Sequence, residues 1–372
     1  MSSNTQEAFF ALLRGGLWEK DVQLSQYGKV DYDEVMRLAE EQSVIGLVTA
    51  GIDHVTDVKI PQEIALQFIG QSLQIEQQNK AMNEFVARLI ERLRNNDVYA
   101  LLVKGQGLAQ CYEKPLWRAS GDVDLLLSDD NYAKAKRVLM PLASSVEGEY
   151  VRAKHLGMTI SDFVVELHGS LHCPLSHRVV RGLKEIQNDA FYSGNVRSWQ
   201  NGKTQIFLLS VENDIVYVFT HFLNHFYKGG IGLRQICDWC RLLWTFRDSL
   251  DLQVIEKRIK KMGLLSEWRA FGAFVVEYLG MPVEALPLYS ADSKWKRKAE
   301  RIKQFILMSG NFGHNRDMSY FSKYPFFIRK CMSMWMRVTD LYNHARIFPM
   351  DSLRFFPRIM FNGLRSAVRG EG

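Results

Sequence analysis

Apolar residues in the first part of the chain recur every three or four positions, which is the spacing of one helix face. Short segments of this kind lie within residues 5–55, at 34–39 and 45–48. Pro61 then precedes a longer helical pattern over about 62–95, and proline is favoured in the first turn of a helix. A turn-forming cluster follows at 95–97, so we expect the long helix to end there.

Between residues 98 and 208 the pattern changes to short apolar runs of strand length, separated by turn residues. Helical spacing interrupts these runs and returns after residue 210. We expect helices near 105–112 and 130–140, and strands near 99–103, 122–127, 145–152, 157–160, 163–168 and 205–208.

This order of elements predicts an α+β fold, with a small mixed sheet, flanking helices, and helical N-terminal and C-terminal regions. We divide the chain into a helical N-terminal region, a core that holds the sheet, a helical domain, and a basic aromatic C-terminal segment. Their ranges are 1–97, 98–208, 209–309 and 310–372.

The composition is that of an ordinary globular protein, with 47% apolar and 24% charged residues among 372. This length suffices for two or three domains. The sequence has no uncharged apolar run of about 18 residues, so we expect no membrane-spanning helix. The first seven residues lack the basic and apolar regions of a signal peptide, so we expect a cytoplasmic protein.

The five cysteines are odd in number and irregularly spaced, which argues against a disulfide framework. Cys237 and Cys240 have the spacing of a redox or metal motif. They lie in an apolar helical pattern with no second pair, however, so we interpret them as buried helix residues.

The most informative motif is Asp122-Val123-Asp124, which opens the apolar run Leu125-Leu126-Leu127. On a strand, alternation places Asp122 and Asp124 on the same face. Two adjacent carboxylates repel each other, and a divalent metal such as Mg²⁺ offsets that repulsion while also binding substrate phosphates. The alternative is a pair of solvated acids at a strand edge.

A second motif precedes it, where an apolar strand at 101–103 leads into Lys104-Gly105-Gln106-Gly107 and a helical pattern. Glycines at such a turn let backbone N–H groups approach a phosphate, and a helix N-terminus favours an anion there. Lys104 adds a positive charge.

Together, Lys104-Gly105, Tyr112 and Arg118-x-Ser120-x-Asp122-x-Asp124 resemble the polymerase-beta-like nucleotidyltransferase superfamily. More narrowly, the chain is similar to the bacterial family of uncharacterised nucleotidyltransferases, over about residues 5–280. Toxin-type nucleotidyltransferases carry a similar run.

The resemblance implies that Asp122 and Asp124 hold Mg²⁺ (or Mn²⁺) on the phosphates of a nucleoside triphosphate. It also implies a set of nucleotide-binding residues: Lys104, Gly105, Gln106, Gly107, Arg118 and Ser120. For Ser120 the alternative is a cap on the turn before the strand.

The superfamily has a third acid on a neighbouring strand, and the resemblance assigns it to Glu166, as a metal ligand or as the base for an acceptor hydroxyl. Alternation in the run 163–168 places Glu166 and His168 on one face. The alternative for Glu166 is an exposed residue paired with Lys154 or Arg152. His168 either orients Glu166, contacts phosphate, or is a structural histidine; His155 and His172 are weaker candidates.

One position departs from the superfamily pattern, because Gln106 stands where a hydroxyl residue usually follows the first glycine. A hydroxyl there helps to hold the outer phosphates, and an amide does so less compactly. The alternative function is therefore a catalytically impaired scaffold or regulator that binds a nucleotide.

Further along, His221 and His225 lie four residues apart on one helix face, and Arg234 lies four residues before Asp238. Similar positions occur in the family, so His221 and Arg234 are candidates for lining the nucleotide or acceptor cleft. Packing and hydrogen bonding are the alternative.

The segment 310–372 carries ten Lys and Arg residues against four acids, interleaved with aromatic residues and methionines. Such a segment suits an anionic membrane surface, a protein partner or nucleic acid. The alternative is a helix packed on the body of the protein with its arginines in solvent.

The leading hypothesis is a Mg²⁺-dependent transfer of a nucleoside monophosphate from the triphosphate to a hydroxyl acceptor. The acceptor would be a sugar, a lipid-linked sugar, a protein or RNA. Because similar proteins often accompany surface-polysaccharide synthesis, a sugar or lipid-linked sugar suits this reaction. The basic aromatic C-terminal segment fits work beside a membrane, so we expect a cytoplasmic enzyme at the inner membrane surface.

Overall fold

The structure, a computed structural model, describes residues 3–310 and 326–368. These residues form two compact units, each discontinuous in sequence. The first unit contains residues 3–36, 44–172 and 183–217, and the second contains 37–43, 173–182, 218–310 and 326–368. The division of the sequence at residues 97, 208 and 309 stays a prediction.

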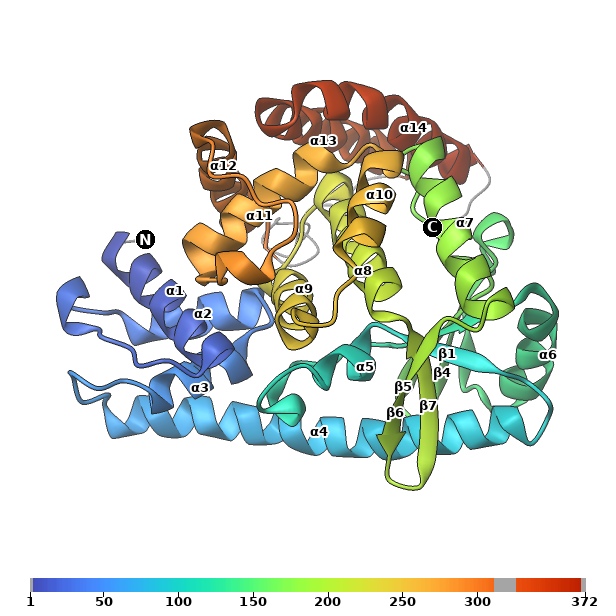
Figure 1. The fold of residues 1–372 in the computed structure, drawn as a ribbon, viewed down its shortest axis with the longest axis horizontal. Coiled ribbons are helices and arrows are strands. Elements are labelled where there is room, and N and C mark those ends of the chain that lie inside the picture. The colour runs from blue at the N-terminus through green and yellow to red at the C-terminus, as the bar shows by residue number, and fades with distance from the viewer. Residues whose placement is uncertain (1–2, 311–325, 369–372) are drawn as a thin grey trace. The chain divides into compact units, whose positions relative to one another are not determined.

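The first unit combines helices with a single sheet (Figure 1). Its helices and 3-10 turns are α1 (Ser3–Trp18), η1 (Ser25–Tyr27), α3 (Ile45–Asp53), α4 (Gln62–Arg94), α5 (Gly105–Ala109), η2 (Pro115–Trp117), α6 (Asp129–Leu139), η3 (Met140–Leu142) and η4 (Val151–Ala153). Three further helices contribute residues to both units, namely α2 (Tyr32–Glu41), α7 (His177–Tyr192) and α8 (Val211–Lys228).

In the described part of the chain, seven strands form one mixed sheet in the order β3-β4-β5-β2-β1-β7-β6. The strands are β1 (Ala100–Val103), β2 (Val123–Leu127), β3 (Ser145–Val146), β4 (His155–Ile160), β5 (Phe163–His168), β6 (Val196–Asn201) and β7 (Thr204–Leu209). The β2–β5 and β1–β7 pairs are parallel, and the other pairs are antiparallel.

One face of this sheet forms the core. Leu102, Leu125 and Leu167 point to that face and pack against buried apolar residues of α4 and α6. The helix α4 runs along the sheet (Figure 1), and Phe85 and Leu89 are among its buried contacts. Because side chains alternate along a strand, the intervening positions of β2 and β5 face the other way and are free to carry polar groups.

The predicted α+β class is confirmed, as are the mixed sheet and its flanking helices. The long helix predicted over 62–95 corresponds to α4. The strand predicted over 145–152 is wrong beyond Val146, because charged residues and Gly148 follow and form strands poorly.

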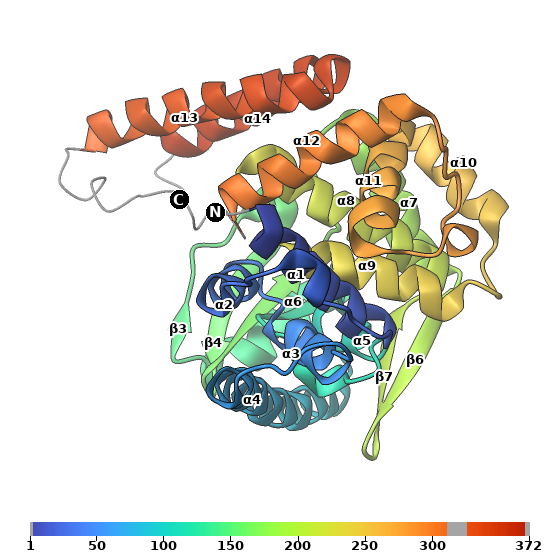
Figure 2. The same ribbon diagram turned by 90° about the vertical axis from the view of Figure 1, so that its left-hand side faces the viewer.

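Two elements of the sheet unit had no prediction, the strand β6 and the helix α7. The strand β6 is a polar edge strand that pairs only with β7, so it has no continuous apolar run to reveal it. Figure 2 shows β6 and β7 as an extended hairpin.

The second unit is helical. Besides its shares of α2, α7 and α8, it contains α9 (Leu233–Phe246), α10 (Leu252–Met262), α11 (Leu265–Leu279), η5 (Val283–Ala285), α12 (Ser293–Ser309), α13 (Phe326–Ile347) and α14 (Pro349–Val368). Its core is aromatic, with Trp239 and Trp268 at 4.8 Å between ring centroids and Phe219 against both. The helices α13 and α14 lie side by side (Figure 2).

Cys237 and Cys240 are buried, unbridged residues of α9, as expected. Within residues 3–310 and 326–368, no helix combines the length and the apolarity that a bilayer crossing requires.

Candidate active site

Three acidic side chains meet on the polar face of the sheet. Asp122 immediately precedes β2, Asp124 lies within it, and Asp124 is paired with Glu166 of β5 in the parallel register. One carboxylate oxygen from each of the three residues lies within 4.8 Å of the others. Asp124 is buried and the other two are partly exposed, so the cluster is open to solvent on one side.

Lys104 neutralises part of this charge. It follows β1 with φ 58° and ψ −148°, a positive-φ conformation uncommon outside glycine, and this residue turns the chain from β1 into the short helix α5. Its Nζ lies 2.6 Å from Asp124 Oδ1. Burial alone would lower the pKa of Lys104, but the charges of Asp124 and its neighbours outweigh burial and hold that pKa above its ordinary value.

The pKa values of Asp122 and Glu166 are shifted in opposite directions. The negative charge of Asp124, together with burial, raises the pKa of Asp122. Burial also disfavours the charged form of Glu166, but hydrogen bonds from His155 and His168 and the charge of Lys104 lower the pKa of Glu166 overall. Glu166 is therefore held as an anion beside Asp124.

Two histidines adjoin Glu166. His155 Nε2 lies 3.1 Å from Glu166 Oε2, and His168 Nε2 lies 3.3 Å from the same oxygen. His168 Nε2 is also 2.7 Å from Asp124 Oδ1. Burial opposes protonation of His168, but its bonds to Asp124 and Glu166 raise the pKa of His168.

The pairing that we considered as an alternative for Glu166 is not formed by Lys154, whose Nζ lies 2.7 Å from Asp129 Oδ1 instead. The side chain of Arg152 lies outside the described residues.

Comparison of the sequence with known protein families identifies the family of this chain. The family model described as "Uncharacterised nucleotidyltransferase" matches residues 28–280, about two thirds of the chain. The chain belongs to this nucleotidyltransferase family. No curated protein and no solved structure matches the chain significantly. The match confirms the resemblance drawn from the motifs, and with it a transferase that uses a nucleoside triphosphate.

In this nucleotidyltransferase, Gln106 faces the helix α4. It is buried, and its Nε2 donates to Asn83 Oδ1 at 2.7 Å and to Asn79 Oδ1 at 3.2 Å. The amide hydrogens are thus used within the protein, and phosphate binding by this side chain would require them to leave both partners.

The two glycines beside Gln106 differ in role. Gly105 has a positive φ of 44°, which glycine adopts without strain. At Gly107, an added Cβ would lie 2.7 Å from Leu208 Cδ2, so the absence of a side chain lets α5 approach β7 closely. The glycines therefore place the turn that follows Lys104.

Arg118 and Ser120 lie in the loop before Asp122. Asn79 Nδ2 donates to the carbonyl oxygens of Leu116 at 2.7 Å and Arg118 at 2.8 Å, which fixes this loop on α4. Among the described residues, the buried Ser120 hydroxyl has no hydrogen-bond partner. A buried hydroxyl without a partner is costly, and a ligand oxygen would satisfy it.

His221 and Arg234 belong to the second unit, whereas the three acids belong to the first. His221 Nε2 lies 3.1 Å from His225 Nε2, and the Arg234 backbone N–H donates to Gln42 O. Their role in lining a cleft stays a prediction.

Sequence reasoning ranked His155 as a weak candidate and did not identify Tyr217, although both lie near the acids. His155 has no motif of its own, and only its direct pairing with His168 across β4 and β5 brings it to Glu166. Tyr217 of α8 is buried near Lys104, and burial raises the pKa of its hydroxyl above the ordinary value. No spacing in the sequence links Tyr217 to Lys104.

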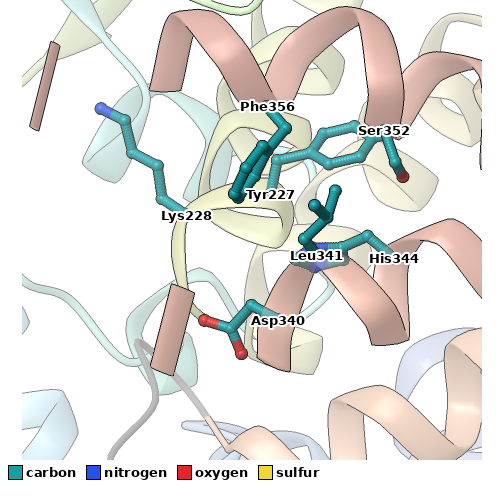
Figure 3. Close-up of a pocket in the computed structure, with 7 residues that line it drawn as sticks. All are labelled: Tyr227, Lys228, Asp340, Leu341, His344, Ser352 and Phe356. Carbon is teal, nitrogen blue, oxygen red and sulfur yellow. The ribbon is translucent and has the colours of Figure 1, made fainter. Parts of the chain in front are cut away.

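A pocket in the second unit offers little room for a substrate. Residues of α8, α13 and α14 line it: Tyr227, Lys228, Asp340, Leu341, His344, Ser352 and Phe356 (Figure 3). The centre of a water molecule can move within only about 10 Å³ of it, which is enough for about one water molecule. The open acidic cluster, and not this pocket, is the candidate active site.

Proposed function

We propose that this nucleotidyltransferase transfers a nucleoside monophosphate from a nucleoside triphosphate to a hydroxyl acceptor, with Mg²⁺ (or Mn²⁺) held by Asp122, Asp124 and Glu166. The observation that carries the proposal is the convergence of these three carboxylates from β2 and β5 on one face of the sheet.

The donor set fits a hard divalent cation, since carboxylate oxygens are the ligands that Mg²⁺ prefers. The unpartnered Ser120 hydroxyl is a further sign that this loop binds a ligand. When bound, the metal supplies positive charge that stabilises the phosphates in the transition state.

The residues of the chain then divide the remaining work. Lys104 and Arg118 bind the triphosphate by charge, and the turn at Gly105 brings backbone N–H groups close to it. The acceptor oxygen bonds to the α-phosphorus as the bond to pyrophosphate breaks. The low pKa of Glu166 makes it a better ligand than base, so we assign the acceptor proton to water.

For the acceptor we propose a sugar or lipid-linked sugar of surface-polysaccharide synthesis, with protein and RNA as the other hydroxyl classes. The support is the C-terminal helix pair, which exposes large apolar side chains beside basic ones. The exposed apolar residues of α13 and α14 include Trp335, Tyr342, Met350, Leu353 and Phe361. Arg346 and Arg354 are exposed on the same helices.

Such a surface suits the headgroup region of an anionic membrane, so we propose a cytoplasmic enzyme that binds the inner membrane surface. The remaining parts of the segment 310–372, at 311–325 and 369–372, lie outside the described residues. Flotation with lipid vesicles tests this proposal. The protein should bind vesicles rich in anionic lipid and should not bind neutral vesicles. A protein that binds neither kind of vesicle would contradict membrane contact.

One observation favours a second function. The amide of Gln106 is bonded to Asn79 and Asn83, so α5 presents no side-chain donor at the position where the superfamily has a hydroxyl. The alternative is therefore a catalytically impaired protein that binds a nucleotide as a scaffold or regulator.

Incubation with each α-labelled nucleoside triphosphate, Mg²⁺ and a cell extract separates the two. Transfer of label that is lost in Asp122→Asn and Asp124→Asn, and kept in the exposed-acid control Asp130→Asn, is the expected result. Nucleotide binding without transfer in the wild type would favour the scaffold.

A further inference from the structure

We propose that His155, Glu166 and His168 form a second cation site, which binds a first-row transition-metal ion such as Zn²⁺. The site adjoins the three acids, and it rests on the proposed function only in that Glu166 would be shared with the Mg²⁺ site. Its geometry stands whatever reaction the acids catalyse.

The register of two strands creates the cluster. His155 of β4 is directly paired with His168 of β5, and Glu166 is paired with Gly157. Cross-strand partners share a face, so both histidines and Glu166 point to the same side of the sheet. Gly157 has no side chain on that face, and the Glu147 carboxylate lies over it, with Oε2 at 2.5 Å from the position that a Cβ would take.

The distances suit a metal ion. One ligand atom of each of the three residues lies within 4.8 Å of the others. The separations from Glu166 Oε2 are 3.1 Å to His155 Nε2 and 3.3 Å to His168 Nε2. Ligands about 2.0–2.1 Å from a tetrahedral ion lie roughly 3.3 Å apart, so small movements suffice to bind one.

The site also has access and an open position. The side chains of His155 and Glu166 are 31% and 25% exposed, and that of His168 is 15% exposed. Three protein ligands leave a fourth position for water or substrate, as in metal sites that take part in chemistry.

The ligand type selects an ion other than Mg²⁺. Imidazole nitrogens suit zinc, cobalt, iron and nickel, whereas Mg²⁺ prefers oxygen. On binding, His168 Nε2 would turn its lone pair to the ion and give up its 2.7 Å contact with Asp124. Asp124 would keep Lys104, whose Nζ lies 2.6 Å away.

The alternative is that the histidines only donate hydrogen bonds to Glu166. Cobalt(II) titration of the full-length, chelator-treated protein distinguishes the two by visible absorption. We expect one equivalent of bound Co²⁺, displaced by Zn²⁺ and not by a large excess of Mg²⁺. His155→Gln should weaken binding at least tenfold.

The matched control is His54→Gln. His54 Nε2 lies 2.8 Å from Glu19 Oε2 in the same unit, and this pair is not among the metal-capable clusters of the described residues. The control should bind Co²⁺ as the wild type does.

X-ray absorption of the wild-type cobalt protein gives a readout that needs no variant, with two imidazole ligands expected. Absence of binding, displacement by Mg²⁺, unchanged affinity in a folded His155→Gln protein, or a cobalt shell without imidazole would each overturn the proposal. These measurements contain no nucleotide. Their outcome therefore does not depend on whether the protein transfers nucleotides.

Discussion

Asp124 and Glu166 are neighbours in the parallel register of β2 and β5, although a helix and two further strands separate them along the chain. Their shared face is opposite the apolar core. Lys104, from the strand on the other side of β2, completes the row at 2.6 Å from Asp124. Positively and negatively charged side chains are thus held on adjacent strands. Each strand is positioned by the leucines on its other face, which pack in the core.

The two aspartates should differ in what they do for stability. Asp124→Asn leaves the buried Lys104 ammonium without its charged partner and should lower the free energy of unfolding by about 2–4 kcal/mol. Asp122→Asn removes repulsion from Asp124, so metal-free stability should stay unchanged or rise slightly. Urea denaturation of the metal-free proteins measures both. A loss in Asp122→Asn as large as in Asp124→Asn would contradict the assigned ion pair.

Asn79 should couple the long helix α4 to the loop that precedes Asp122. Asn79→Ala leaves the carbonyl oxygens of Leu116 and Arg118 without their donor, at a cost of roughly 2–3 kcal/mol. Nucleotide affinity should fall with it, because these carbonyls fix the loop that carries Ser120. Thermal unfolding and nucleotide titration measure the two effects, with the exposed neighbour Gln78→Ala as the control. Equal behaviour of the two variants would show that the loop holds its position without Asn79.

Substitution by alanine should have opposite effects on stability at two helical glycines, Gly46 and Gly70. A Cβ at Gly46 would lie 2.0 Å from the carbonyl oxygen of Trp117, so Gly46→Ala must push α3 and this loop apart. We expect a loss of at least about 2 kcal/mol. At Gly70 nothing lies within 4 Å, and Gly70→Ala should stabilise α4 by about 0.5–1 kcal/mol. Chemical denaturation of both variants is the measurement, and destabilisation by Gly70→Ala would count against the described helix.

Glu267 should make the stability of the second unit depend on pH. Burial, with the charge of Asp351, raises the pKa of Glu267 to about 8, while the Tyr227 hydroxyl, which donates to it at 3.2 Å, and the Lys298 ammonium act in the opposite direction. Between its ordinary pKa near 4.5 and about 8, the folded protein keeps a proton that the unfolded chain releases. Stability from this group is therefore complete below the lower value and is lost as pH rises through the upper one.

Glu267→Gln stays neutral and should abolish that loss. The variant should match the wild type at pH 5 and exceed it at pH 9 by on the order of a few kcal/mol. Unfolding curves at the two pH values test this, with the exposed Glu284→Gln as the control. A wild-type stability that does not fall across this interval, relative to Glu267→Gln, would show that Glu267 is ionised in the fold.

Much of the sheet could be predicted from the sequence, because alternation and apolar runs are local signals. The strands at 99–103, 122–127 and 163–168 follow from such runs, and the Asp-x-Asp spacing alone puts both aspartates on one face. Edge strand β6 could not be found in this way, since it buries little and its polar residues hide its periodicity.

The family, the fold class and the grouping of Asp122 with Asp124 on one face could be predicted from the sequence, because these depend on residue types at short spacings. The folded arrangement was needed to show that His155 reaches Glu166, that Gln106 turns to Asn79 and Asn83, and that Lys104 pairs with Asp124. It also decided that Gln42 bonds to the Leu233 N–H and so places residues 37–43 in the second unit. Each of these depends on strand register or helix packing, which is set by apolar contacts between residues far apart in the chain.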